Sequence, residues 1–237
     1  MFFRFNYGKL IWCLLTIVAL LAILLLSPVA DYIQTSGEPP VQTLVIDAGH
    51  GGEDGGAVAE NGTLESEINL DIALRLEALA DFWGIPVVMT RSTPEIQYPE
   101  NAETLSAKKK ADQNARIGLI QSIPGAVLIS IHQNYYPSAA PWGIQVFYGA
   151  VSGSEPLAEI AQENLTEQLA PDNRRLASPI NESIYLMRKA ECPAILVECG
   201  FLSNASELEK LETESYRTEL AAVLLASYQE YTEGIIR

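Results

Sequence analysis

Cysteine is scarce in this chain, and its placement excludes the usual thiol chemistry. The 237 residues include three cysteines, of which Cys13 lies in an apolar N-terminal run. Cys192 and Cys199 flank an apolar stretch that predicts a strand, and seven extended residues span roughly 23 Å, which is beyond the reach of a disulfide. No CxxC pair is present, so a zinc site built on thiolates is not expected.

Basic residues are also few. Lysine and arginine total 15 against 30 aspartates and glutamates, which gives a net charge of −15. Such a chain repels nucleic-acid phosphates, so we expect no nucleic-acid partner. Apolar residues make up 48% of the sequence, which excludes global disorder, and the length suits one good-sized domain.

The chain has one long apolar run, near its N-terminus. Residues 10–26 contain a single polar side chain, Arg4 and Lys9 precede them, and the next charges are acidic. A run of this length just spans a bilayer, and the positive flank places the N-terminus in the cytoplasm. We therefore predict a signal-anchor or transmembrane helix within residues 1–30, which holds the rest of the protein at the extracytoplasmic face of the membrane. Cleavage after Ala30, followed by secretion, is the less favoured alternative.

After a polar, proline-bearing linker at residues 31–42, residues 43–237 are predicted to form one domain. Apolar segments typical of strands alternate with amphipathic segments typical of helices. The expected strands are 43–48, 86–90, 126–131, 143–148 and 194–197, and the expected helices are 65–83, 107–121, 155–169, 206–211 and 214–233. We predict a single α/β domain with a twisted, mostly parallel sheet, mixed at its edge, and helices on both faces. Thr63 is the expected N-cap of the first helix, and the strand at 143–148 has hairpin-like or edge character.

Histidine is even rarer than cysteine, and both histidines hold the same kind of position. His50 and His132 each follow a short apolar strand, and a third apolar strand ends at Glu198. In open α/β sheets, ligands gather at the carboxyl ends of the strands, so these three side chains are expected to converge. Two imidazoles and a carboxylate suit Zn²⁺, with one position left open for water.

Spacing alone leaves the third metal ligand open. The candidates are the carboxylates near His50, namely Asp47, Asp54, Glu65 and Glu67. Asp47 lies inside the strand and can instead orient an imidazole. The glycines around His50 also fit a simple turn, and they lack the pattern of a nucleotide-binding loop.

Four motifs in order resemble a known family. They are VIDAGHGGEDGGA at 45–57, GTLESEIN at 62–69, SIHQN at 130–134 and LVECGFLSN at 196–204. Together they are similar to the zinc-dependent N-acetylmuramoyl-L-alanine amidases (amidase_3 type) of bacterial cell walls. The segment KKKADQNAR at 108–116 and the single-domain plan are most similar to the sporulation and germination-specific members.

The resemblance implies one zinc ion per chain, held by His50, Glu65 and His132, with Glu198 as the carboxylate that moves protons. It implies hydrolysis of the amide between the lactyl group of N-acetylmuramic acid and L-alanine, with peptidoglycan as substrate in the cell wall or spore cortex space. Cooperation with a deacetylase that forms muramic lactam would follow from a spore role. Ser66 and Gln133 depart from the family pattern beside the metal ligands, which bears on substrate preference.

Several further residues have two interpretations. Asn69 is expected to cap or brace the site, and Asn134 either binds substrate or turns the chain. Arg91 either contacts a substrate carboxylate or forms a structural salt bridge, the second being favoured. Tyr135, Tyr136 and Trp142 either stack on sugar or pack. Competing functions are another zinc peptidase or deacetylase of the wall, and a non-catalytic amidase-like regulatory domain.

Overall fold

The computed structural model describes residues 15–18 and 41–236, and the region from Val41 onward forms its own compact unit. The predicted membrane segment at residues 1–30 lies outside the described residues, apart from residues 15–18. Within the described ranges, no helix is long and apolar enough to cross a bilayer. Cys192 and Cys199 are free thiols.

A six-stranded sheet forms the centre of the domain. Its strands are β1 (Thr43–Ala48), β2 (Val87–Met89), β3 (Ala126–Asn134), β4 (Gln145–Tyr148), β5 (Ser178–Pro179) and β6 (Ala194–Phe201), arranged in the order β2-β1-β3-β6-β4-β5. All neighbouring pairs are parallel except β4 and β6, which are antiparallel. The predicted α/β class with a mixed sheet is confirmed.

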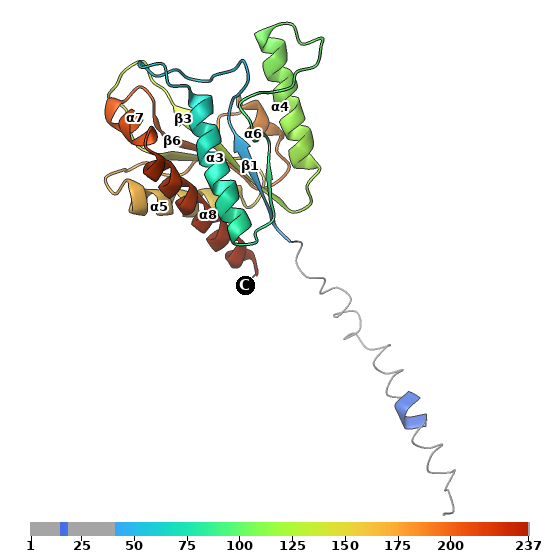
Figure 1. Cartoon of the computed structure of the whole chain (residues 1–237). Coiled ribbons are helices and arrows are strands. Elements are labelled where there is room, and N and C mark those ends of the chain that lie inside the picture. The colour runs from blue at the N-terminus through green and yellow to red at the C-terminus, as the bar shows by residue number, and fades with distance from the viewer. Residues whose placement is uncertain (1–14, 19–40, 237) are drawn as a thin grey trace, which may run out of the picture. The chain divides into compact units, whose positions relative to one another are not determined.

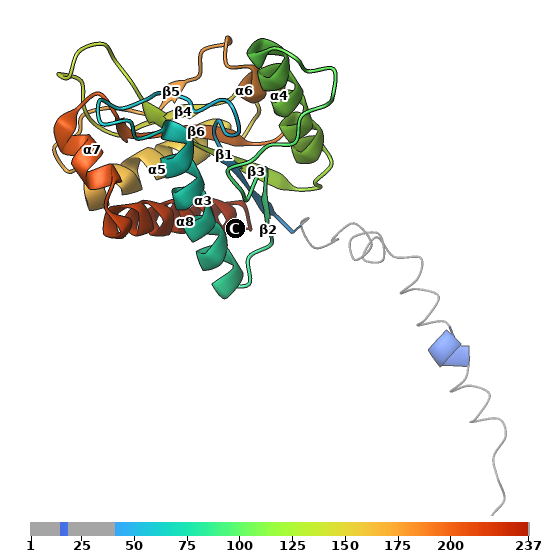
Figure 2. The same ribbon diagram turned by 45° about the horizontal axis from the view of Figure 1, so that its top comes forward.

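Helices cover both faces of this sheet, as Figure 1 shows. One face carries α3 (Glu65–Phe82), α5 (Ser154–Leu169), α7 (Ala205–Leu211) and α8 (Glu214–Ile236), and the other carries α4 (Leu105–Gln121) and α6 (Tyr185–Lys189). The same grouping is visible from the second direction (Figure 2). The period-two alternation of strands explains it, because successive side chains point to opposite faces. Leu44 and Ile46 of β1 pack with the first group, whereas Val45 packs with the second.

Helix α3 begins differently from the expectation, and the difference positions the site. Leu64, not Thr63, is the N-cap residue, and its side chain forms no capping hydrogen bond. Main-chain carbonyls replace it, because the amides of Glu65 and Ser66 donate to the oxygens of Ala57 and Gly55 at 2.9 and 3.1 Å. The first turn of α3 is thereby fastened to the glycine-rich loop that follows β1.

Two strands run further than the sequence predicted. Strand β3 continues through His132 to Asn134, and β6 continues through Glu198 to Phe201, so neither side chain follows the end of its strand. Strand β4 is not the edge strand, since the two-residue β5 pairs with its outer side. The register of β3 and β6 places His132 opposite Glu198.

Candidate metal centre

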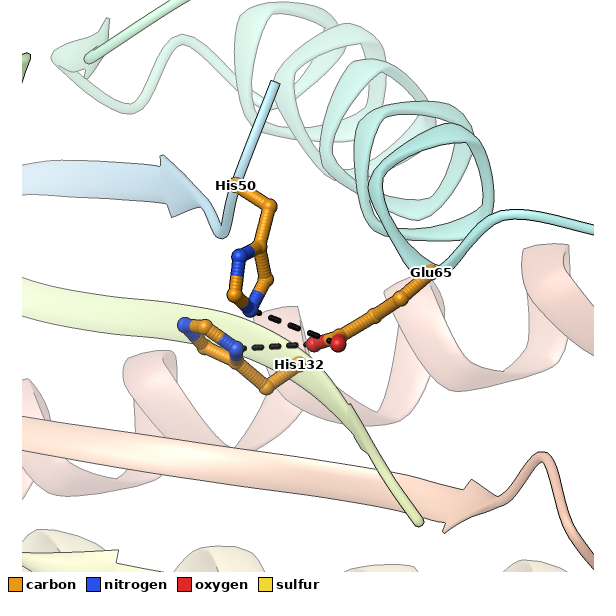
Figure 3. Close-up of side chains that lie close together, drawn as sticks. All are labelled: His50, Glu65 and His132. Carbon is orange, nitrogen blue, oxygen red and sulfur yellow. Dashed lines mark hydrogen bonds and ion pairs between the residues drawn. The ribbon is translucent and has the colours of Figure 1, made fainter. Parts of the chain in front are cut away.

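The two histidines meet a single carboxylate near the carboxyl end of β1, as Figure 3 shows. Glu65, the first residue of α3, projects toward both imidazoles. Its Oε1 lies 2.9 Å from Nδ1 of His132, and its Oε2 lies 3.3 Å from Nε2 of His50. The imidazole rings stand 5.0 Å apart between centroids, at 77° to one another. One ligand atom from each of the three residues lies within 4.8 Å of the other two.

This donor set fits a zinc ion. Two imidazoles and one carboxylate are a common protein ligand set of a catalytic zinc site, which keeps a further position open. Among the four carboxylates that spacing left as candidates, only Glu65 reaches both histidines in the part of the chain that the structure describes.

Glu65 is held in place as an anion. Its carboxylate accepts hydrogen bonds from the amides of Ala57 and Gln133 at 2.9 and 3.1 Å, and from Nδ2 of Asn69 at 3.3 Å. Burial favours the neutral acid, but the hydrogen bonds to His132 and His50 outweigh it and lower the pKa of Glu65 well below its usual range. Asn69 therefore braces the carboxylate, and Gln133 in turn donates to Oδ1 of Asn69 at 3.1 Å.

Asp54, not Asp47, contacts an imidazole. Its Oδ2 lies 2.9 Å from Nδ1 of His50, an arrangement that fixes the ring and leaves Nε2 facing Glu65. Burial opposes a charge on His50, but the hydrogen bonds to Asp54 and Glu65 raise the pKa of its imidazole to about 9. The surrounding negative charge stabilises either a proton or a metal ion at this position.

Asp47 instead forms a buried network beneath the site. Its Oδ2 accepts from the hydroxyl of Ser130 at 2.6 Å, and its Oδ1 accepts from Thr90 and Arg116 at 2.7 and 2.8 Å. Burial alone would raise the pKa of Asp47, but the Arg116 guanidinium leads the interactions that lower it to about 2. The expectation that Asp47 orients an imidazole is wrong, because its position inside β1 directs the side chain toward α4.

Two buried arginines hold the main chain of the loop that carries His50. Arg91 donates to the carbonyls of Ala48 and Gly49 at 2.9 and 3.1 Å, and to that of Ser66 at 2.8 Å. Arg116 donates to the carbonyls of Ala48 and His50 at 2.7 and 2.6 Å. Within the described ranges the Arg91 guanidinium binds carbonyls and forms no salt bridge, so the favoured salt-bridge interpretation is wrong, whereas contact with a substrate carboxylate stays a prediction. Arg116 was missed, because arginine-to-carbonyl contacts leave no spacing signal.

We expect Arg116→Met to destabilise the domain by about 3–5 kcal/mol near pH 7, since it leaves Asp47 buried without its countercharge. The folded-state pKa of Asp47 lies below the value of 3.8 that is usual for an aspartate, so the stability it contributes is present above about pH 4 and is lost as the pH falls through about 2. The loss caused by the substitution should therefore shrink in acid. Urea unfolding across this pH range measures it.

Arg75→Met is the matched control. Arg75 pairs with Asp71 at 2.8 Å on the surface, where side-chain exposures are 27% and 36%, so its loss should cost less than about 1 kcal/mol. Equal destabilisation by the two substitutions would contradict the assigned role of Arg116.

Glycine is required where the loop passes His132. A β-carbon built on Gly49 would collide with the Cε1 and Nε2 atoms of the His132 ring. Position 50 itself has a φ of 60°, unusual for a residue with a side chain, and this conformation turns His50 inward. The missing side chain at Gly49 and the positive φ of His50 together allow the two imidazoles to lie close to each other.

We predict that Gly49→Ala lowers zinc affinity by at least about tenfold through displacement of His132, an effect comparable to the loss of a residue that orients a ligand. Gly62→Ala serves as a comparison, since nothing lies within 4 Å of a β-carbon there, although its φ of 92° adds backbone strain. Zinc titration with a competing chelator measures both. Unchanged zinc affinity in Gly49→Ala would show that the loop relaxes without moving the ring.

Glu198 lies beside the three residues without joining them. Burial raises its pKa to about 7, while the nearby His132 imidazole opposes that rise. Its Oε2 atom is buried and has no hydrogen-bond partner within the described part of the chain. A carboxyl group that has one oxygen without a hydrogen-bond partner and a pKa near neutral pH is suited to accept and return a proton.

A cavity of about 310 Å³ opens over this cluster. His50, Glu65, His132 and Glu198 line its floor, and residues of α4 and of the segment around α6 line its walls. Helix α6 has only five residues and was not predicted, yet its Tyr185 bonds to Asn114 of α4 at 3.1 Å and joins the two walls.

Three aromatic side chains near the end of β3 face solvent. Tyr135, Tyr136 and Trp142 are 50%, 55% and 46% exposed, so they are not core packing residues, and they do not line the cavity.

The main chain of Asn134, the last residue of β3, accepts a hydrogen bond from the Leu202 amide at 2.9 Å.

The amino-acid sequence is similar to those of known N-acetylmuramoyl-L-alanine amidases. The family model described as N-acetylmuramoyl-L-alanine amidase matches residues 44–229. The germination-specific N-acetylmuramoyl-L-alanine amidase of Bacillus subtilis is 35% identical over 189 residues, which cover 79% of this chain and 78% of that protein. The amidase LytC of the same species is 30% identical over 77% of this chain but only 34% of its own length.

Solved structures agree with the sequence comparisons. The CwlD amidase of Clostridioides difficile, solved in complex with the GerS lipoprotein, superposes with a TM-score of 0.78 at 33% identity, covering 81% of this chain and 98% of that one. The catalytic domain of CwlV from Bacillus (Paenibacillus) polymyxa superposes with a TM-score of 0.66 at 27% identity, covering 81% and 98% of the two chains. The predicted resemblance, including that to the germination-specific type, is confirmed.

Proposed function

Because the chain belongs to the N-acetylmuramoyl-L-alanine amidase family, we propose that it hydrolyses peptidoglycan at the amide between the lactyl group of N-acetylmuramic acid and L-alanine. The observation that carries the proposal is the convergence of His50, Glu65 and His132 in one cavity with Glu198, whose buried Oε2 has no hydrogen-bond partner among the described residues. A single zinc ion is assigned to the first three residues. When bound, zinc polarises a substrate carbonyl and lowers the pKa of a water molecule.

The residues of the chain orient the metal ligands and transfer the proton. Asp54 and Asn69 hold the His50 ring and the Glu65 carboxylate in fixed orientations. Glu198 accepts the proton of the attacking water as the new carbon–oxygen bond forms. It then returns that proton to the alanine nitrogen as the carbon–nitrogen bond breaks, so that the products are a free lactyl carboxylate and a free peptide amine.

Mass spectrometry of the products tests this assignment. Purified protein with zinc is incubated with peptidoglycan, and the expected products are intact stem peptides with a free L-alanine amine. Release of D-alanine would instead indicate a carboxypeptidase, and release of acetate a deacetylase. No product at all, with zinc bound, would favour a non-catalytic regulatory domain.

We also propose a cellular setting for this activity. Similarity to a germination-specific amidase supports action in the spore cortex, alongside a deacetylase that completes muramic lactam. The apolar run at residues 10–26 supports an anchor in the membrane, with the catalytic domain on the extracytoplasmic side. Loss of muramic lactam from the cortex of a deletion strain is the expected result, and an unchanged cortex would contradict the spore role.

A further inference from the structure

The cavity is rich in carboxylates but contains one exposed ammonium group. Asp47, Asp54, Glu65, Asp112 and Glu198 line it, against the two cations Lys109 and Arg116. The Arg116 guanidinium is 5% exposed and is engaged by Asp47, Asp112 and two carbonyls. Lys109 is therefore the cation of this cavity that remains open to a ligand.

Helix α4 fixes where this ammonium lies. Lys109 is in the second turn of the helix, its side chain is 44% exposed, and its Nζ lies 2.8 Å from Oδ1 of Asp54. The other oxygen of Asp54 bonds to His50, so Lys109 is separated from a metal ligand by one carboxylate. An ammonium group has three donors, and within the described residues its ion-pair partner is Asp54 alone, which leaves donors for a bound anion.

We propose that Lys109 binds a carboxylate of the peptide that follows the L-alanine of the substrate, and that it makes the enzyme prefer an acidic residue at that position over its amidated form. This inference rests on the proposed function. The residue after the alanine lies about 3.8 Å further along the chain between Cα atoms, so its carboxylate falls within a few ångströms of the reacting amide. Lys109 lines the same cavity and is separated from His50 by one carboxylate, so its ammonium is placed to contact this group of the substrate.

The neighbouring lysines do not share this position. Lys108 forms an ion pair with Glu53 and lies 5.5 Å from the centre of the Tyr98 ring, and Lys110 is exposed. Neither lines the cavity. Lys110 thus provides a matched control, with the same charge on the same helix but outside the site.

The test compares two synthetic muramoyl peptides with the zinc-loaded full chain. One carries D-isoglutamate after L-alanine, and the other carries D-isoglutamine, which removes only the charge. We expect the wild-type kcat/KM to favour the acid by roughly 3- to 10-fold, the range of an ion pair at a partly exposed site. Lys109→Gln should abolish this preference through KM, whereas Lys110→Gln should keep it and Lys109→Arg should retain part of it.

A merely structural role of Lys109 gives a different pattern. If the residue acts only by supporting Asp54 and His50, Lys109→Gln will lower zinc affinity and will slow both substrates equally, which overturns the proposal. A wild-type enzyme that cleaves both peptides equally well also overturns it. Failure of the proposed function looks different again, because neither peptide would be cleaved by zinc-loaded wild-type protein.

Discussion

Glu198→Gln should lower kcat by about 10²- to 10⁴-fold while the protein keeps its zinc, since general acid–base catalysis has this magnitude. Glutamine is nearly the same size as glutamate, but it cannot take a proton from water and return it to the leaving nitrogen. Glu198 is not one of the three residues that group around the metal position, so zinc content should remain one ion per chain. Steady-state hydrolysis of a muramoyl peptide, with zinc measured on the same sample, checks both expectations.

Glu191→Gln is the control for this substitution, because Glu191 is an exposed glutamate seven residues earlier. It should leave kcat and zinc content unchanged. Near-normal turnover by Glu198→Gln would remove Glu198 from the mechanism. Loss of zinc from Glu198→Gln would instead mean that this carboxylate is a ligand.

The same substitution should stabilise the metal-free protein in neutral and alkaline solution. Burial raises the folded-state pKa of Glu198 from 4.5 to about 7, so the folded state binds the proton more tightly than the unfolded state does. Stability contributed by this group therefore declines as the pH rises from about 4.5 through 7. Thermal unfolding should show Glu198→Gln and wild type alike at pH 4 and the variant more stable, on the order of 1–3 kcal/mol, at pH 8.

Glu65→Gln should lower zinc affinity by at least about 100-fold and abolish measurable hydrolysis at limiting zinc, because it removes the one anionic ligand between two imidazoles. The substitution also disturbs the metal-free site. The carboxylate accepts from the amides of Ala57 and Gln133 with different oxygens, and the amide nitrogen of a glutamine would have to face one of these donors. Zinc titration with a competing chelator, followed by activity at saturating zinc, separates affinity from turnover.

Glu67→Gln provides the comparison for Glu65. Glu67 lies in the same first turn of α3, but it is exposed and outside the cluster. Its substitution should change neither zinc affinity nor activity. If Glu67→Gln loses zinc and Glu65→Gln does not, the assignment of the third ligand is reversed.

Hydrophobic periodicity predicted the strands and helices that form the core. The runs at 43–48 and 126–131 became β1 and β3, because buried parallel strands have a continuous apolar signature that few other elements share. Because each of the three apolar runs leads to one of these residues, the sequence also predicted that His50, His132 and Glu198 lie together at the carboxyl ends of the strands. The predicted ends of β3 and β6 came too early, because polar residues that face a cavity interrupt the apolar run without interrupting the hydrogen-bonded ladder.

Short elements and carbonyl contacts could not be predicted in this way. Helix α6 has five residues and β5 has two, which is too short for any period to be visible, yet α6 forms a wall of the cavity. The choice between Asp47 and Asp54 as partner of His50 depends on the turn after β1, where His50 adopts a positive φ. A spacing argument has no access to that dihedral angle.

Arg91 and Arg116 hold the loop after β1 by its main chain, and this determines which residues of the loop can change during evolution. Both guanidinium groups bind peptide oxygens, which every amino acid carries, so they fix the path of the chain independently of most side chains on the loop's outer surface. An outward-facing position such as Glu53, which is exposed, can therefore accept many residues while His50 stays in place. We therefore expect exposed positions of this loop to tolerate substitution and the two arginines not to tolerate it. New substrate contacts can then arise on the loop while the positions of the metal ligands stay the same.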